Sequence, residues 1–358
     1  MRTLLIILLL ISPLGASAAE APSASAAEAP SGRQWFAGES SLFIEVNFQR
    51  LQQGNLFRDL YPLIGNTPAA RQQLETLRTD LGIDIMSELH RITISMPPPN
   101  PSTPNVPPLI LIQGSFDAAQ LYERLKAKMP NATEQTIAGR PVAHTSEGQS
   151  QAMVRVEEGI LVGSLERIQG ALAAPGTIGG PIGELLGTLT APNDILFAAY
   201  VPDMIRQAAA ARNPFLGSFN RISGYIDSAD GFVLRVGARE AEAGKAAALA
   251  ALATAQLQQI GANPQALPFR PLLERIQVSA AQQHLNLSIN LGMPEVAQLK
   301  GIAMMMMMGL AQQQQQRAAP PQPSNFPTLQ RPASPPAGAP AAPAAPTLAP
   351  APAPTVSE

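Results

Sequence analysis

Residues Ile276 to Leu291 have the sequence IQVSAAQQHLNLSINL, in which two alternating runs flank a polar centre. From Leu285 to Leu291 every second residue is leucine or isoleucine, and the residues between them are asparagine or serine. This period of two is typical of a strand that is buried on one face only. The stretch therefore predicts a β-hairpin, and a helix expected over Pro294 to Gln316 follows it directly.

The same unit, a hairpin followed by a helix, is expected four times along the chain. The other three hairpins are expected over 90–114, 152–163 and 219–239. A single alternating strand opens each half of the chain, at Leu42 to Asn47 and at Asp194 to Val201. Both halves therefore have the predicted order strand, helix, hairpin, helix, hairpin, helix.

This order predicts an α+β fold of two similar halves, residues 35–190 and 191–316. Each half is expected to form an antiparallel sheet of β-hairpins with helices packed on one face. Within each half the order β-α-β-β-α-β is partly ferredoxin-like. The matching orders suggest an internal duplication, and a single large α+β domain is the alternative.

The N-terminal residues predict export. Met1 to Ala18 combine an arginine at position 2, an apolar run, Pro13 and small residues at the end, which is the pattern of a secretory signal peptide. Cleavage after Ala18 or Ala19 would give a periplasmic or secreted protein. The alternative is an uncleaved signal that tethers the chain to the inner membrane. No other stretch is long and apolar enough to span a bilayer.

The segments that flank the two halves have no apolar pattern. Residues 19–34 are expected to form a flexible leader, and residues 317–358, rich in proline and alanine, a disordered tail. Neither segment can bury enough apolar surface to offset the entropy lost on ordering.

Met304 to Met308 form an unusual run of five methionines. Thioethers are soft ligands, so such a cluster is one way to bind Cu(I). Five consecutive helical positions point in all directions, however, and do not converge on one ion. The favoured interpretation is the end of a packed helix, because methionine fills irregular gaps.

The composition excludes several classes of protein. The chain has no cysteine, so it forms no disulfide and no thiolate metal site. Its 24 basic and 26 acidic residues give a formal net charge of −2, and the basic residues are scattered, which argues against a nucleic-acid surface. Abundant alanine, proline and glutamine with few aromatic residues favour a bacterial envelope or secreted protein.

Motifs of catalysis and cofactor binding are missing from the sequence. The three histidines, His90, His144 and His284, belong to no HExxH pair. Ser164 is expected to cap a helix, and the glycine-rich stretch Gly176 to Gly180 lacks the Lys-Ser/Thr of a P-loop, which favours a linker. We therefore expect no cofactor and no metal, and we favour a non-enzymatic protein over an enzyme with a dispersed active site.

One group of polar residues remains as a possible binding surface. In the predicted strands these side chains alternate with apolar ones, so they share the face opposite the core. If helices cover only the apolar face, the polar face is open to a peptide, a glycan or a partner protein, and a merely solvated face is the alternative. The residues are Arg91, Thr93, Ser95, Gln277, Ser279, Asn286, Ser288 and Asn290.

The sequence thus favours an exported protein that binds a partner or has a structural role in the envelope. The partner classes left open are an envelope protein, a glycan and a lipid. A second hypothesis is a carrier that holds an apolar, lipid-like ligand in a cavity between sheet and helices. It arises because strands such as Leu109 to Ile112 are apolar on both faces.

Overall fold

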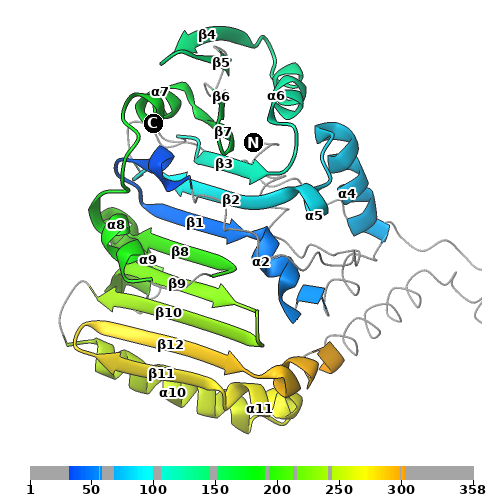
Figure 1. Cartoon of the computed structure of the whole chain (residues 1–358). Coiled ribbons are helices and arrows are strands. Elements are labelled where there is room, and N and C mark those ends of the chain that lie inside the picture. The colour runs from blue at the N-terminus through cyan, green and yellow to red at the C-terminus, as the bar shows by residue number, and fades with distance from the viewer. Residues whose placement is uncertain are drawn as a thin grey trace, which may run out of the picture. The chain divides into compact units, whose positions relative to one another are not determined.

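Figure 1 shows the computed structural model of the chain. It describes residues 32–55, 57–58, 68–99, 106–145, 151–189, 193–212, 216–240, 244–298 and 300–302. The expected signal peptide, most of the leader, the Met304 to Met308 run and the tail lie outside the described residues.

The strands of the described residues follow the alternating stretches of the sequence closely. The first half contains β1 (Leu42–Asn47), β2 (Leu89–Met96), β3 (Leu109–Gly114), β4 (Thr133–Ile137), β5 (Arg140–His144), β6 (Gln151–Val156) and β7 (Gly159–Ser164). The second half contains β8 (Ile195–Tyr200), β9 (Phe219–Asp227), β10 (Phe232–Glu240), β11 (Ile276–Ala281) and β12 (His284–Leu291). The hairpin predicted over Ile276 to Leu291 is confirmed as β11 and β12.

Helices occupy most of the predicted positions between these strands. They are η1 (Arg33–Phe36), α2 (Phe48–Gln53), α4 (Pro68–Leu81), α5 (Ile85–Glu88), α6 (Ala118–Ala127), α7 (Leu165–Ala173), α8 (Gly180–Gly187), α9 (Asp203–Arg212), η2 (Leu216–Ser218), α10 (Ala246–Ala262), η3 (Pro264–Phe269) and α11 (Arg270–Leu273). After β12, residues 293–298 and 300–302 are helical. Within the described part of the chain no helix has the length and apolar character needed to cross a membrane.

All twelve described strands belong to one sheet. Its order is β11-β12-β10-β9-β8-β1-β2-β3-β7-β6-β5-β4, and every neighbouring pair is antiparallel. The α+β class is confirmed, but the prediction of a separate sheet for each half is wrong. The ferredoxin-like expectation is also wrong, because that arrangement requires parallel neighbours joined by a crossover.

The two halves join where β1 pairs with β8 at the middle of the sheet. Outward from this pair the order is β2, β3, β7, β6 on one side and β9, β10, β12, β11 on the other, so these strands match in order, and β5 and β4 extend the first half beyond them. At the joint each half also donates a backbone hydrogen bond to the other. Asn47 N donates to Asp194 O and Tyr200 N donates to Ser41 O, both at 2.7 Å. This agreement supports the duplication hypothesis, which stays a hypothesis.

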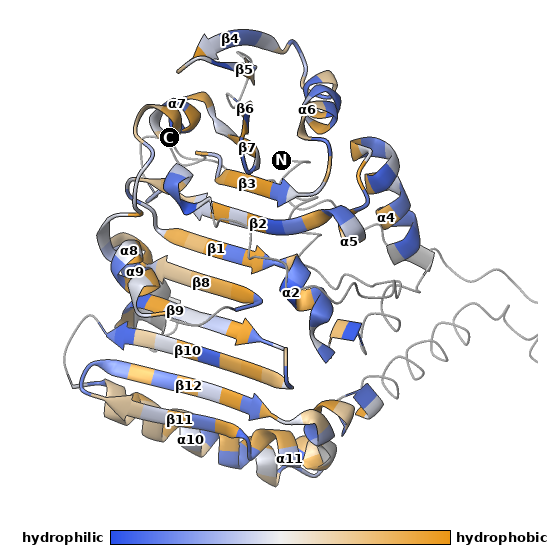
Figure 2. Ribbon diagram, viewed as in Figure 1, coloured by the Kyte–Doolittle hydropathy of each residue, from blue (hydrophilic) through white to orange (hydrophobic). Residues whose placement is uncertain are grey.

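Helices cover both faces of the first half, which corrects the expectation of helices on one face. On one face η1 and α7 bury Phe43, Leu111 and Leu161. On the other face α6 buries Ile92 and Ile160. The strands between these layers are apolar on both sides, and Figure 2 shows the hydrophobic colour along β1 and β3.

The first-half core extends into the second half. Leu196 and Ala198 of β8 are buried in the same cluster as Trp35 and Phe36 of η1 and Ile168 of α7. The core of residues 35–190 is therefore completed by a strand that lies beyond residue 190. Both halves belong to one compact unit, residues 1–308; a second unit, residues 309–358, lies outside the described part.

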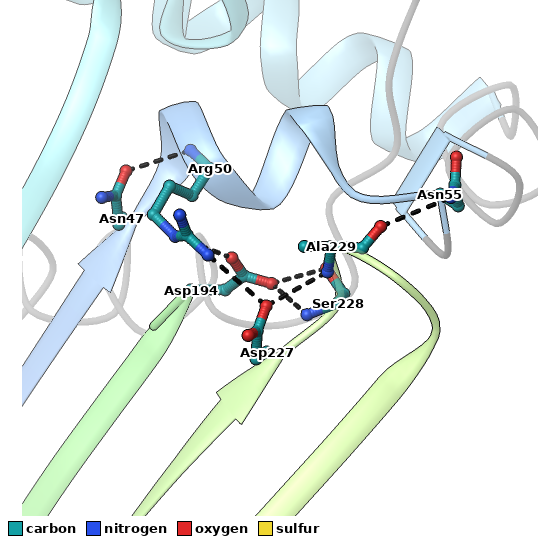
Figure 3. A network of polar contacts seen from close by, with 7 residues as sticks. All are labelled: Asn47, Arg50, Asn55, Asp194, Asp227, Ser228 and Ala229. Carbon is teal, nitrogen blue, oxygen red and sulfur yellow. Dashed lines mark hydrogen bonds and ion pairs between the residues drawn. The ribbon is translucent and has the colours of Figure 1, made fainter. Parts of the chain in front are cut away.

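A polar network fastens α2 to the turn between β9 and β10 (Figure 3). Asp194, which is 1% exposed, accepts hydrogen bonds at Oδ2 from Ser228 N at 2.6 Å and from Ser228 Oγ at 2.5 Å. Arg50 Nε lies 3.6 Å from Asp194 Oδ1, and Arg50 Nη2 lies 3.5 Å from Asp227 Oδ1. Gly54 permits this close approach, since a Cβ there would lie 2.2 Å from Ser228 Oγ.

Burial raises the pKa of the Asp194 carboxyl, and the two hydrogen bonds from Ser228 act in the opposite direction. Because its pKa is raised, the folded protein binds this proton more tightly than the unfolded chain does. The ionised carboxylate therefore lowers stability as the pH rises from the ordinary aspartate range through the raised pKa. The Ser228 donors limit that loss.

The shared core predicts that the halves unfold together. Leu196→Ala should lower the free energy of unfolding by about 2–5 kcal/mol, because it leaves a cavity between β8, η1 and α7. Calorimetry of the variant should still show one transition for the compact unit. Met204→Ala, at a side chain 54% exposed, is the matched control and should change stability by less than about 0.5 kcal/mol. Two separate transitions would contradict the shared core.

The network at Asp194 predicts a pH-dependent loss on removing one donor. Ser228→Ala should lower the free energy of unfolding by about 1.5–3 kcal/mol at neutral pH, the contribution of a hydrogen bond to a charged group. The loss should shrink in acid, where the carboxyl is protonated and the bond is neutral. Denaturant titrations across pH measure it. Ser41→Ala is the control, because Ser41 Oγ donates to the neutral Pro97 carbonyl and its loss should not vary with pH.

Candidate functional site

The second half has a polar sheet face, here called the open polar face, which α8 covers over β8 and part of β9 and which is open over β10, β12 and β11. The register of β9, β10, β12 and β11 places its side chains together, opposite the face on which α10 packs. Most of them are exposed, and Ser223 is buried between its neighbours. Its residues are Arg221, Ser223, Tyr225, Arg235, Gly237, Arg239, Gln277, Ser279, His284, Asn286, Ser288 and Asn290.

Cross-strand pairing arranges this face in rows. One row contains Ser223, Gly237, Asn286 and Ser279, and the next contains Tyr225, Arg235, Ser288 and Gln277. Successive rows are about 7 Å apart, because two residues separate them along each strand. Gly237 adds no side chain, so its row exposes backbone between amide and hydroxyl groups. The result is a broad hydrogen-bonding surface with donors and acceptors from asparagine, glutamine and serine.

The end row is basic. Arg239 of β10 is directly opposite Arg221 of β9 on one side and His284 of β12 on the other. Directly opposed residues have Cβ atoms about 5 Å apart, and like charges at that distance destabilise a sheet. We call Arg221, Arg239 and His284 the basic row. Its two like charges are Arg221 and Arg239, and a bound anion would give Arg239 a partner.

Acidic partners for this row are few among the described residues. Arg221 forms an ion pair with Glu184 of α8 at the edge of the face. Arg239 and Arg235 have no carboxylate within salt-bridge distance in that part of the chain, and the Arg235 guanidinium carbon lies 6.0 Å from the centre of the Tyr225 ring. Asp227 faces the opposite end of the strands, where Arg50 neutralises it. A net positive surface therefore exists on a chain with net charge −2.

Five of the eight residues proposed from the sequence lie on this face. Gln277, Ser279, Asn286 and Asn290 are exposed, and Ser288 is half-buried. The expectation that they share a face with Arg91, Thr93 and Ser95 agrees with the register through the whole sheet.

The expectation of an open surface is wrong for Arg91, Thr93 and Ser95, which are all buried. Helix α7 covers this end of the face, and Arg167 donates from Nη1 to Ser95 O at 2.7 Å and from Nη2 to Ser95 Oγ at 3.0 Å. Burial lowers the pKa of Arg167 to about 10. The error came from assuming that helices lie on one side only.

The sequence reasoning missed the charged and aromatic members of the face. Arg235 and Arg239 alternate with Leu234, Val236 and Ala238 along β10, so the period of two was sufficient to find them. The basic row itself was not visible, because it depends on which strands become neighbours. That pairing joins residues from three strands across 64 positions of sequence.

The histidines and acidic residues of the described part do not gather into a cluster that could hold a metal. No group of three histidine, aspartate or glutamate side chains there is placed to hold a metal ion. His90, His144 and His284 lie on β2, β5 and β12, none of which are neighbours in the sheet. Ser164 caps α7, its Oγ accepting from Arg167 N at 3.4 Å, as expected.

Comparison with known proteins gives a likeness of fold. No protein-family profile matches the sequence, and no curated protein matches it. Crystal forms III and I of the Treponema protein TP0453 resemble the structure with TM-scores of 0.44 and 0.41, each at 9% sequence identity. The alignments cover 76% and 78% of this chain and 96% and 98% of the TP0453 chains. A likeness of this degree assigns no function to this chain.

Proposed function

We propose that this chain is an exported, non-enzymatic binding protein whose open polar face binds an acidic glycan. The observation that carries the proposal is the basic row, in which Arg221, Arg239 and His284 are directly opposed on three neighbouring strands. Arg239 lies opposite Arg221 and has no carboxylate within salt-bridge distance among the described residues, so a ligand that supplies negative charge would give it a partner.

The groups around the basic row fit a hydroxyl-rich ligand. Guanidinium groups bind carboxylate, sulfate or phosphate groups with two parallel hydrogen bonds. Asparagine and serine side chains both donate and accept, as sugar hydroxyls do. Arg235 lies two rows, about 13 Å, from Arg239 along β10. Two acidic groups at separate positions of an extended polymer can therefore bind one arginine each.

A protein partner fits this surface less well. Binding energy between proteins is concentrated in buried aromatic and aliphatic anchors. The open polar face offers one aromatic ring, Tyr225, and it is already packed beneath Arg235. Export is supported by the signal-like sequence of Met1 to Ala18, and it would give the protein access to envelope or extracellular glycans.

The proposal predicts that removing charge from the basic row weakens binding. Arg239→Gln should lower the affinity for an acidic polysaccharide such as polygalacturonate or heparin by about tenfold or more, the equivalent of one charged hydrogen bond. Added salt should weaken the unmodified protein's binding and have less effect on the variant. Calorimetry or glycan-array binding of the whole chain measures both, with neutral dextran as the uncharged probe.

The same substitution distinguishes a role of Arg239 in binding from a role in stability. Arg239→Gln should leave thermal stability unchanged or raise it slightly, because it removes the like charge opposite Arg221. Arg78→Gln, at an exposed arginine of α4, removes the same charge elsewhere and should not change binding. Equal affinity for dextran, or full affinity in Arg239→Gln, would refute the acidic-glycan proposal.

A second candidate is the carriage of an apolar ligand, favoured by one observation on the opposite face. Leu234, Val236, Leu287 and Ile289 share that face and are only half-buried. Lipid that copurifies with the chain and is displaced by Val236→Asp, but not by Arg239→Gln, would support the carrier. Solvent extraction and mass spectrometry of the purified protein decide between the two faces.

A further inference from the structure

Among the described residues, no strand pairs with the outer edge of β11, the strand at one end of the sheet. It pairs with β12 on one side only, and its sequence IQVSAA contains no charge and no proline. Gln277, Ser279, Ala280 and Ala281 are exposed. Edge strands of soluble proteins are normally blunted by lysine, proline, a bulge or a covering segment, because their free N–H and C=O groups pair readily with another strand.

The opposite edge of the sheet is different. Strand β4, with sequence TEQTI, contains Glu134, which pairs with Lys126 at 3.0 Å and accepts from Tyr122 Oη at 3.0 Å. A charged, engaged side chain opposes edge-to-edge pairing there. Among the described strands, the edge that lacks such a device is therefore β11.

Helix α10 extends the same uncharged surface. It packs on β11 and β12, and Figure 1 shows it lying along β11 at the outer end of the sheet. Ala246 to Ala262 contain no charged residue, although Leu252 is 49% exposed and Ile260 is 50% exposed. An exposed helix of a monomeric protein normally has charges on its outer side. An uncharged edge strand thus lies beside an uncharged exposed helix.

We infer that the β11 edge, with α10 beneath it, is a dimer interface at which two copies of this chain join their sheets. The occupant is a second copy because β11 is complementary to itself. With a two-fold axis normal to the sheet at Val278, Gln277 faces Ser279 of the other copy, and Ile276 faces its Ala280. Polar residues then meet polar residues on one face, a large side chain meets a small one on the other, and like charges are never opposed.

This dimer closes and does not polymerise. Each copy has one β11 edge, so the interface is isologous and is used up by one partner. An axis normal to the sheet keeps each face continuous, so the two open polar faces adjoin and the two α10 helices flank the new joint on the opposite side. The inference does not depend on what the open polar face binds.

Sedimentation velocity of the full chain tests the dimer. We expect a concentration-dependent monomer–dimer equilibrium and no larger species. Gln277→Lys combined with Ser279→Lys places lysine opposite lysine twice in the paired edges and should weaken dimerisation at least tenfold. Thr133→Lys with Thr136→Lys, on exposed positions of β4, adds the same charge to the other edge and should leave the dimer intact. A monomer at all concentrations, or a dimer disrupted only by the β4 changes, would overturn the inference.

Cysteine crosslinking locates the contact. The natural chain has no cysteine, so a single introduced thiol can form a disulfide only with another copy. Residues opposed across an axis have Cα atoms about 4.5–5.5 Å apart, which a disulfide spans. Val278→Cys should therefore crosslink rapidly into dimers under mild oxidation, and Gln135→Cys on β4 should not. Equal crosslinking at both edges would show random collision and refute the interface.

Discussion

The antiparallel pairing of β1 with β8 is the constraint on which the rest of this structure depends. These two strands open the two halves of the chain, and their reciprocal backbone bonds turn two sets of hairpins into one sheet. Because the faces of the sheet continue across the joint, each strand side chain of either half lies on one of two common faces. The buried network of Arg50, Asp194 and Ser228 then holds α2 of the first half against a turn of the second.

The two halves use the common faces differently, and their side chains explain why. Strands β3 and β7 of the first half are apolar on both sides, so helices cover both. Strand β12 and the middle of β10 alternate between apolar and polar residues, and α10 packs on the apolar side. A matched order of strands has thus produced a covered half, which serves as the core, and an open half, which presents a surface.

The polar side of the open half combines a hydrogen-bonding surface with a basic end. Its central rows consist of hydrogen-bonding groups with Arg235 as their one charged member, whereas its end row places Arg239 between Arg221 and His284. The repulsion between opposed like charges is small, and the rigid sheet holds their side chains in place despite it. Surfaces that retain unfavourable charge on rigid strands are suited to ligands that neutralise it.

The sequence by itself determined where several strands begin and end, as in β1, β3 and the β11–β12 hairpin, because burial on one face imposes a period of two on neighbouring residues. It also determined that the polar residues of each strand share a face. Only the tertiary structure decided that the halves form one sheet, that α7 buries Arg91, Thr93 and Ser95, and that Arg221, Arg239 and His284 meet. These facts depend on which strands become neighbours, and local periodicity contains no information about pairing between distant segments.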